Sequence, residues 1–463
     1  MRTLPAAVVV LLALSNAVEL FGAESGGECE KKIPIDSRPH SVSIVEFGAV
    51  GDGKTLNTLA FQNAIFYLKS FADKGGAQLY VPQGRWLTGS FNLTSHLTLF
   101  LEKGAVIIAS QDPSDWDIVD PLPSYGRGVD VPGKRYRSLI NGYMLHDVVI
   151  TGDNGTVDGQ GSAWWDLYAS GSLNYSRPHL VEFISCNYTV VSNITFLNSP
   201  SYSIHPVYSS NVLVRNLSIY APPESRYTVG IVPDSSDAVC IEDCSIGVGF
   251  DAISLKSGWD EYGISYGRST TNVHVRRVGL QATFGSCLAF GSEMSGGISD
   301  VLVEHVHISD SNKGLDFRTA RGRGGYITEI TASDIHMENV NTAFSATGQC
   351  DTHPDDKYDP DALPSVSSIT LRNITGTNIS FAGNLTGISG APFTGICLSD
   401  ISLSIASKYS NSSTFWVCSY VSGISESVFP EPCPELESGL NSYASSTSCF
   451  SHRSSTTQPV DDT

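Results

Sequence analysis

A short pattern of hydrophobic and polar positions recurs along the chain from about residue 180. Each copy begins with a small polar residue and continues with alternating β-branched residues, which is the period of a half-buried strand. The first copy is Asn187–Ile194, and later copies start at Asn211, Asp237, Asn272, Asp300, Tyr326, Ser368 and Gly395. Most starts are 24 to 28 residues apart, a spacing typical of solenoid proteins.

Each copy holds two or three short strands broken by Gly, Asn or Ser, and it leaves no room for a crossover helix. Such a coil cannot bury its inner face alone, whereas stacked coils share a continuous core. The pattern therefore predicts an all-β fold, a right-handed parallel β-helix. A leucine-rich repeat would need a leucine scaffold that the copies lack. An antiparallel sandwich would need Asn-Gly hairpin signals, which are sparse.

A solenoid also needs a cover over its open end, and the N-terminal part of the chain offers one. Residues 55–72 predict a short amphipathic helix that packs one apolar face on the core. That face would consist of Phe61, Ile65, Leu68 and Phe71. A cap for the first turn is expected at Thr55, Asn57 or Thr58. A Pro-, Asp- and Gly-rich region between residues 110 and 137 is expected to form loops at the rim of a groove.

The extreme N-terminus indicates a secreted chain. Arg2 precedes an apolar stretch from Leu4 to Leu14 that is too short to span a bilayer, and small residues follow at 15–17. We expect a signal peptide over residues 1–17, extending to about residue 23. The expected location is extracellular, in the cell wall, without membrane attachment.

Length and charge narrow the remaining possibilities. The 463 residues fit one solenoid domain over residues 40–435, followed by a Ser-rich tail over residues 436–463 that we expect to be disordered. A net charge of −19 argues against nucleic acid as a partner. A polyanionic substrate would need a locally basic groove. We expect a monomer that needs neither a cofactor nor a metal.

Cysteines and sequons agree with export. Ten cysteines, an even number, suggest disulfides, and Cys418–Cys433 is the local bridge that we expect. Zinc binding is the competing interpretation, but neither paired CxxC spacing nor a histidine cluster accompanies the cysteines. Ten Asn-X-Ser/Thr sequons would be glycosylated only in a secreted chain: Asn92, Asn154, Asn174, Asn187, Asn193, Asn216, Asn373, Asn378, Asn384 and Asn411.

Seven short segments, spread in order along the chain, carry a family resemblance. They are Val45–Gly53, Gly76–Pro82, Gly84–Ser90, Asn198–Val207, Ser257–Gly263, Gly291–Gly297 and Gly322–Tyr326. In these segments the chain resembles plant polygalacturonase-like proteins of glycoside hydrolase family 28, in the pectin lyase-like superfamily. The likeness extends from about residue 40 to 435, and the right-handed β-helix that it implies agrees with the repeat pattern.

The resemblance implies inverting hydrolysis of the α-1,4-galacturonan of pectin. Such a site needs one carboxylic acid for the leaving oxygen and, roughly 6.5–9.5 Å away, carboxylates that activate water. Asp251 matches the second of two adjacent aspartates in the family and is the predicted base. Phe250 stands at the position of the general acid, and Val229 at that of the second base. Tyr227 takes the place of a family asparagine two positions before that base. The resemblance therefore implies a substrate class together with impaired turnover.

Other positions that match the family would bind the substrate. Ser286 takes the place of a family histidine. The family's Arg-Ile-Lys becomes Asp316-Phe317-Arg318, in which Arg318 would pair with a galacturonate carboxylate and Asp316 should repel it. Lys256 and Tyr326 also match family positions and would line the groove.

Most of these residues have a structural interpretation as well. Asp251 would then be a coil-edge carboxylate bonded to turn amides, with Phe250 and Val229 as apolar fillers. We interpret His205 as a structural histidine. Asp260 is interpreted as a solvated loop acid, and Arg321 and Arg323 as surface cations near the rim. Two residues remain candidates for a substitute acid, Glu261 and Glu293.

Two functions from different classes follow from the sequence. The first is a secreted polygalacturonase-type hydrolase acting on pectin, with Asp251 as its base and an unidentified acid. The second is a catalytically inactive cell-wall protein that binds pectin in the same groove. A β-elimination lyase would need a calcium–carboxylate cluster and an arginine base, and Asp251 with Arg318 is too little to indicate one.

Overall fold

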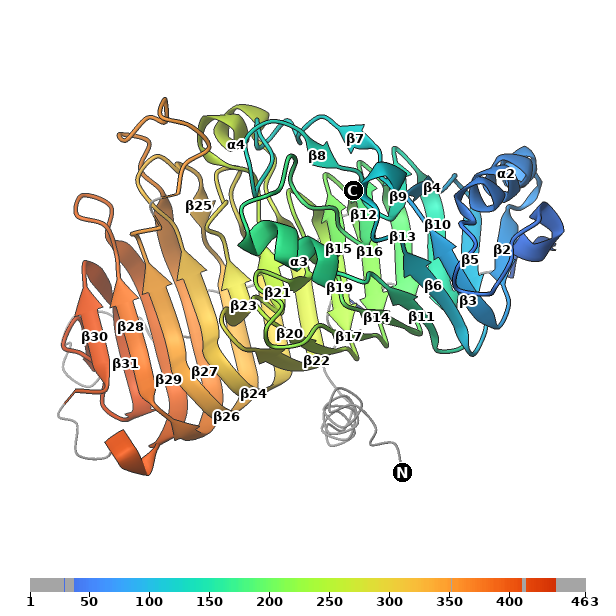
Figure 1. The fold of residues 1–463 in the computed structure, drawn as a ribbon. Coiled ribbons are helices and arrows are strands. Elements are labelled where there is room, and N and C mark those ends of the chain that lie inside the picture. The colour runs from blue at the N-terminus through green and yellow to red at the C-terminus, as the bar shows by residue number, and fades with distance from the viewer. Residues whose placement is uncertain (1–28, 30–36, 351, 410–413, 439–463) are drawn as a thin grey trace, which may run out of the picture.

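The computed structural model describes residue 29 and residues 37–350, 352–409 and 414–438. Figure 1 shows a single stack of coils that runs from the N-terminal to the C-terminal end of this part of the chain. Within it, every strand pair is parallel except β7 (Ile118–Val119) with β8 (Arg135–Tyr136). The stack confirms the predicted right-handed parallel β-helix, and the parallel pairing excludes the antiparallel sandwich.

Successive coils pair along three faces of the stack. The first face contains β1 (His40–Ser43), β2 (Ala77–Val81), β5 (Leu97–Leu101), β10 (His146–Gly152), β13 (Asn187–Ser192), β16 (Ser210–Arg215) and β19 (Asp237–Glu242). The second contains β3 (Gly84–Thr88), β6 (Ala105–Ala109), β11 (Gly155–Asp158), β14 (Ile194–Leu197), β17 (Ser218–Tyr220) and β20 (Ser245–Val248).

We call the third face the site face. Its strands are β4 (Phe91–Asn92), β9 (Ile140–Tyr143), β12 (Val181–Ile184), β15 (Tyr202–Val207), β18 (Val229–Ile231), β21 (Ile253–Leu255), β23 (Ser286–Phe290), β28 (Phe381–Thr386) and β30 (Trp416–Ser419). Longer strands bend from one face to the next: β22 (Thr271–Ala282), β24 (Val301–Arg318), β26 (Ile330–Thr347), β27 (Ser365–Ile379), β29 (Phe393–Ile405) and β31 (Val421–Phe429). β24 and β26 end on the site face.

Buried side chains on the inner side of the site face hold the residues on its outer side in place. Aligned residues of consecutive coils point into the core and are at most 1% exposed: Ile204, Ile231, Ile253, Leu288, Leu315 and Phe344. Burial of each such side chain contributes roughly 1.5–3 kcal/mol. Because side chains alternate along a strand, this inward ladder fixes the neighbouring residues on the outside at repeated positions.

The predicted helix forms at the N-terminal end of the stack (Figure 1). α2 (Thr58–Leu68) buries Phe61, Ile65 and Leu68, and the ring of Phe61 stacks on Phe91 of β4 at 4.5 Å. The helix is shorter than expected, because its last residues continue as the 3-10 helix η3 (Lys69–Lys74). Asn57 is the N-cap residue, but its side chain bonds the backbone of neighbouring turns instead of the helix.

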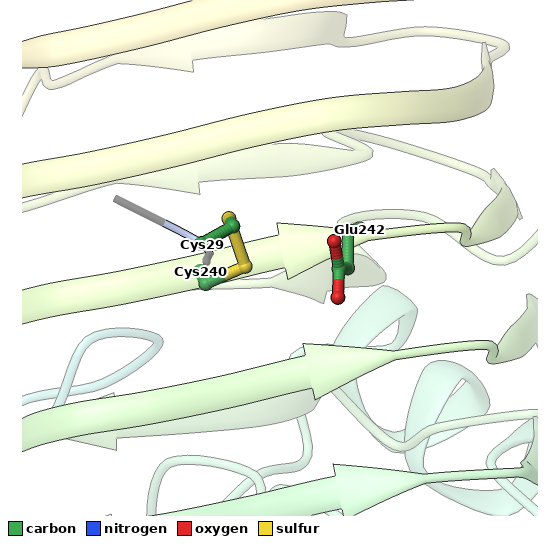
Figure 2. A group of neighbouring side chains, drawn as sticks. All are labelled: Cys29, Cys240 and Glu242. Carbon is green, nitrogen blue, oxygen red and sulfur yellow. A yellow bond between two sulfur atoms is a disulfide. The ribbon is translucent and has the colours of Figure 1, made fainter. Parts of the chain in front are cut away.

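Disulfides account for only part of the cysteines. Cys418–Cys433 is bonded as predicted. A second bridge, which could not be inferred from cysteine spacing, joins Cys29 to Cys240 on β19 across 211 residues (Figure 2). The disulfides that the even count suggested are therefore present, but they do not include every cysteine, because Cys186, Cys244, Cys287 and Cys350 are free thiols. Burial raises the pKa of the Cys244 and Cys287 thiols to about 12, so they act as small apolar side chains.

Some expectations concern other parts of the chain. The expected signal peptide, the sequon at Asn411 and all but the start of the Ser-rich tail lie outside the described residues. The described chain ends in β32 (Leu436–Ser438), which pairs with β31, so the last coil extends three residues beyond position 435. None of the described helices has the length and apolarity that crossing a bilayer requires.

Candidate functional site

The site face brings together residues from three consecutive coils. Asp251 precedes β21, Ser286 begins β23, and Arg318 ends β24. Asp251 is 1% exposed and its carboxylate is fully engaged. Its Oδ2 accepts a hydrogen bond from Nη2 of Arg318 at 2.5 Å, and its Oδ1 accepts one from the backbone N–H of Ser286 at 2.9 Å. Three of the predicted site residues therefore form one cluster.

Asp316 belongs to the same cluster, which the sequence analysis did not foresee. Its Oδ2 accepts hydrogen bonds from the Ser286 hydroxyl at 2.9 Å and from Nζ of Lys313 at 3.0 Å, and Nε of Arg318 lies 3.9 Å away. The expectation that Asp316 would repel a substrate was wrong, because its carboxylate is buried and paired with cations. Ser286 and Arg318 each contact both Asp251 and Asp316, so two carboxylates share one guanidinium.

Lys256 follows β21, on the same coil as Asp251, and forms an ion pair with Glu293, which follows β23. Burial alone would raise the pKa of Glu293, but the charges of Lys256 and Arg323 outweigh it and lower that pKa to about 2. A carboxylate that is ionised at every physiological pH has no proton to donate. Glu293 is therefore unsuited to the role of substitute acid, and the charge of Lys256 is already balanced.

The remaining candidate residues differ in their surroundings. Tyr326, on β25 (Tyr326–Ile327), is 37% exposed, and its ring lies against Gly297 instead of the Asp251 cluster.

Burial, followed by the nearby charges of Asp355 and Asp260, raises the pKa of Glu261. The pKa of Asp316, which burial would raise, is lowered by Arg318 and Lys313. Of the acids discussed, Glu261 alone has the direction of shift that a general acid requires.

Phe250 and Val229 form an apolar patch beside Asp251. Val229, on β18, is 3% exposed and clusters with Tyr202 and Val232, against which Phe250 packs. The guanidinium of Arg318 lies 5.8 Å from the centre of the Phe250 ring. Where the family resemblance predicts two carboxyl groups, this chain therefore presents an apolar surface with a cation at its edge.

A loop crosses the site face on the N-terminal side of Asp251, and we call its residues 122–128 the strap. The backbone carbonyl of Ser124 accepts a hydrogen bond from the backbone N–H of Trp259, which precedes α4 (Asp260–Tyr266). Arg127 donates a hydrogen bond of 3.1 Å to the carbonyl of Pro354. The strap therefore begins in a loop at one edge of the sheet and reaches the loops at the other edge. The predicted loop region 110–137 thus covers part of the face as well as its rim.

A buried polar network lies beneath the strap. His205 of β15 contacts Glu182 through Nδ1 at 3.1 Å and Asp234 through Nε2 at 3.4 Å. Arg135 pairs with both oxygens of Glu182, and the Tyr125 hydroxyl donates to Asp234 at 2.5 Å. This arrangement agrees with the interpretation of His205 as a structural histidine. His179 is nearby, but its Nδ1 accepts the Tyr202 N–H, so that nitrogen is not free to bind a metal.

We expect the pH dependence of stability to report on this network. Burial alone would lower the pKa of His205, but its bonds to Asp234 and Glu182 and their charges outweigh burial and raise the pKa. The resulting stabilisation is complete below the ordinary value of about 6.5 and is lost as the pH rises through the raised value. The melting temperature should therefore fall as the pH rises above about 6.5 and through the raised pKa of His205.

The matched variant for this prediction is His205→Asn, which retains hydrogen-bonding capacity but does not titrate. Melting temperatures measured across the same pH range should vary less in this variant than in the natural chain. Identical pH profiles would contradict the assignment.

Two charged residues that we interpreted from the sequence as exposed are buried in the structure. Arg323 and Asp260 are each 0% exposed and form an ion pair, and His353 contacts the same carboxylate at 2.6 Å. Arg323 also donates to the carbonyl oxygens of Ser292 at 2.8 Å and Thr352 at 2.6 Å. The local sequence pattern did not indicate this burial, because a Gly-rich, charged stretch is typical of exposed loops. Arg321 is exposed, as expected.

Comparison with known proteins shows similarity over most of the chain. Residues 124–427, more than half of the chain, match the family model described as glycosyl hydrolases family 28. The chain is 48% identical over 428 residues to a probable polygalacturonase of Vitis vinifera, covering 91% of this chain and 87% of the relative. It is 26% identical to an exopolygalacturonase of Zea mays, over 84% of this chain and 90% of that protein.

Solved structures show the same architecture. The crystal structure of a hyperthermoactive exopolygalacturonase from Thermotoga maritima superimposes with a TM-score of 0.73 at 25% identity, covering 90% of this chain and 95% of that one. A polygalacturonase from Erwinia carotovora gives a TM-score of 0.66 at 20% identity over 85% and 99% of the two chains, which supports the fold alone. The extent of the family match and the identity to the Vitis relative confirm the resemblance found in the sequence: the chain belongs to glycosyl hydrolases family 28.

Proposed function

We propose that this chain is a secreted, polygalacturonase-type hydrolase of pectic galacturonan, with Asp251 as its base and Arg318 as a substrate-binding cation. The observation that carries the proposal is the cluster of Asp251, Ser286 and Arg318 on consecutive coils, at positions matching the family. A β-helix holds such groups rigidly, and a preorganised carboxylate can activate a water molecule without reorganisation. Expected export to the cell wall, where pectin lies, fits this assignment.

One specific observation favours a second candidate function, a catalytically inactive protein that binds pectin. The positions of the general acid and the second base are occupied by Phe250 and Val229, which pack in an apolar cluster. General acid–base catalysis contributes roughly 10²–10⁴-fold, and departure of an unactivated alkoxide depends on the acid. The natural chain should therefore hydrolyse galacturonan slowly while it still binds it.

The electrostatics of the cluster shape how binding would occur. Arg318 already pairs with Asp251, and Lys256 with Glu293, so an incoming uronate carboxylate meets balanced ion pairs instead of unpaired cations. Binding then requires Arg318 to share its guanidinium between Asp251 and the ligand. The guanidinium has five N–H donors, and its hydrogen bonds to Asp251 and to the carbonyl oxygen of Gly291 do not use all of them, so a donor is left for the ligand.

The variant Arg318→Gln tests the proposal. Loss of a charged hydrogen-bond donor should weaken binding of oligogalacturonate roughly tenfold or more, since such bonds contribute about 1.5–3 kcal/mol. Titration calorimetry with the glycosylated protein measures this, and circular dichroism verifies that the variant is folded. Lys103→Gln, in an exposed turn between β5 and β6, controls for the loss of one positive charge.

The same preparation distinguishes the two functions. Reducing ends released from polygalacturonate by the natural chain, and their loss on Asp251→Asn, would favour the hydrolase. Binding without release of reducing ends would favour the inactive protein. If the natural chain neither binds nor cleaves galacturonan, both assignments fail.

A further inference from the structure

Two of the positions at which this chain departs from the family pattern are neighbours in space. Tyr227 replaces the family's asparagine and Phe250 its first aspartate, and the centres of their rings are 5.0 Å apart. Val229, the third departure, belongs to the apolar cluster on which Phe250 packs. The three substitutions, separated by up to 23 positions in sequence, therefore change a single surface next to Asp251.

The aromatic surface extends beyond these two residues. Tyr168, on α3 (Ser162–Ala169), packs edge-on against Tyr227 with ring centres 5.4 Å apart. Tyr227 is 45% exposed, while Tyr168 and Phe250 are partly exposed. Neither phenol hydroxyl has a hydrogen-bond partner among the described residues, so both remain available to a ligand. Tyr168, Tyr227 and Phe250 form a row that we call the aromatic row.

An arginine lies at each end of the aromatic row, but the two differ in availability. Arg177 lies over Tyr168 at 4.4 Å, has a side chain 1% exposed, and is held by Asp130 through bonds of 2.8 and 3.0 Å. Arg318 lies over Phe250 at 5.8 Å, and its side chain is 13% exposed. Arg177 therefore positions Tyr168, whereas Arg318 is the cation that a ligand on the row would reach.

We propose that the aromatic row is a stacking platform for one sugar ring of an acidic polysaccharide, with the sugar's carboxylate directed to Arg318; this rests on the proposed binding of galacturonan. The C–H groups on one face of a pyranose carry partial positive charge and are attracted to the negative face of an aromatic ring. A neutral sugar would use only the rings. The combination of rings with Arg318 favours a uronate.

The platform gives the departures from the family pattern a common physical role. Aromatic side chains provide large contact area at low cost in conformational entropy, and Tyr adds a polar hydroxyl at the edge. Where the family has two carboxyl groups, this chain has an apolar surface. The negative charge that would repel a uronate is therefore absent. The site would thereby hold a sugar acid where a catalytic acid would otherwise stand.

The test uses the full-length glycosylated chain and trigalacturonate as the probe, with dissociation constants from titration calorimetry. Tyr227→Ala should weaken binding about five- to tenfold, and Tyr227→Trp should retain it, because stacking depends on a ring and not on the phenol. Phe66→Ala removes a ring that is 81% exposed on α2, at the N-terminal end of the stack, and should leave binding unchanged. The methyl-esterified trimer should bind more weakly than the free acid to the natural chain.

Each outcome decides one question. Native-like affinity in Tyr227→Ala, or equal weakening in the Ala and Trp variants, would overturn the platform while leaving the proposed function intact. Equal affinity for the esterified and free trimers would overturn the role of Arg318 as the carboxylate partner. Failure of the natural chain to bind any trimer would instead overturn the proposed function, and the platform for galacturonate with it.

Discussion

Introduction of aspartate at positions 250 and 229 together should raise the rate of polygalacturonate hydrolysis roughly 10²–10⁴-fold over the natural chain. Phe250 and Val229 border the same surface beside Asp251, so the two new carboxyl groups would complete a set of three. The double variant Phe250→Asp/Val229→Asp supplies both a proton for the leaving oxygen and a second group to hold water. Reducing-end assays on both proteins measure the difference.

The size of the gain depends on the pKa of the carboxyl group at position 250. Arg318, which lies over the ring of Phe250, would lower this pKa, while Asp251 and the carboxyl group at position 229 would raise it. Partial burial also raises it. Two negative charges raise the pKa, and the one guanidinium that lowers it is already shared with Asp251. The carboxyl group at position 250 should therefore favour the protonated form that a general acid needs. Phe250→Asp alone should therefore recover more activity than Val229→Asp alone.

The matched control is Phe250→Asn/Val229→Asn, which has nearly the same shape without a titratable proton. It should remain as slow as the natural chain. Because Val229 is 3% exposed, a polar group there will also lower stability, so melting temperatures must accompany the rates. Hydrolysis by the natural chain as fast as by the aspartate variant would show that another carboxyl group donates the proton; Glu261, with its raised pKa, would be the first to examine.

The architecture could be predicted from the sequence because it depends on a repeated local rule. Copies such as Asn187–Ile194 alternate β-branched and polar residues, and stacking is the arrangement that buries every copy. The cap helix followed from the spacing of Phe61, Ile65 and Leu68. Its C-terminal boundary did not, since a 3-10 turn and an α-helical turn share the same apolar spacing over a few residues.

The sequence indicated three of the residues in the site but not the contacts between them. The sequence located Asp251, but its partners Ser286 and Arg318 come from the next two coils, and their convergence depends on coil length. Asp316 and Arg323 were misjudged because a charged residue in a Gly-rich or polar stretch is usually exposed. Arg323 is buried because it pairs with Asp260, 63 positions away in sequence. Asp316 pairs with its sequence neighbours Lys313 and Arg318, and it is buried because the coil that contains Ser286 packs beside it.

Replacement of Arg323 by methionine should lower the free energy of unfolding by about 3–5 kcal/mol, because it leaves the carboxylate of Asp260 buried without its cation. Arg323 is 0% exposed and joins α4 to the loops that contain Ser292 and Thr352, along one edge of the site face. Urea denaturation followed by tryptophan fluorescence measures the loss, with Trp259 next to the pair as a reporter.

Most of the loss in unfolding free energy should come from leaving the charge of Asp260 buried without a partner, and less from the loss of attraction within the pair. In that case Asp260→Asn/Arg323→Met, which removes both charges, should be more stable than Arg323→Met alone. Lys134→Met, which breaks the exposed pair with Asp120, should leave the unfolding midpoint unchanged because water screens that pair. Equal losses in the Arg323 and Lys134 variants would mean that the buried cation contributes no more than a surface one, and the loops along this edge of the site would then be held by their backbone hydrogen bonds alone.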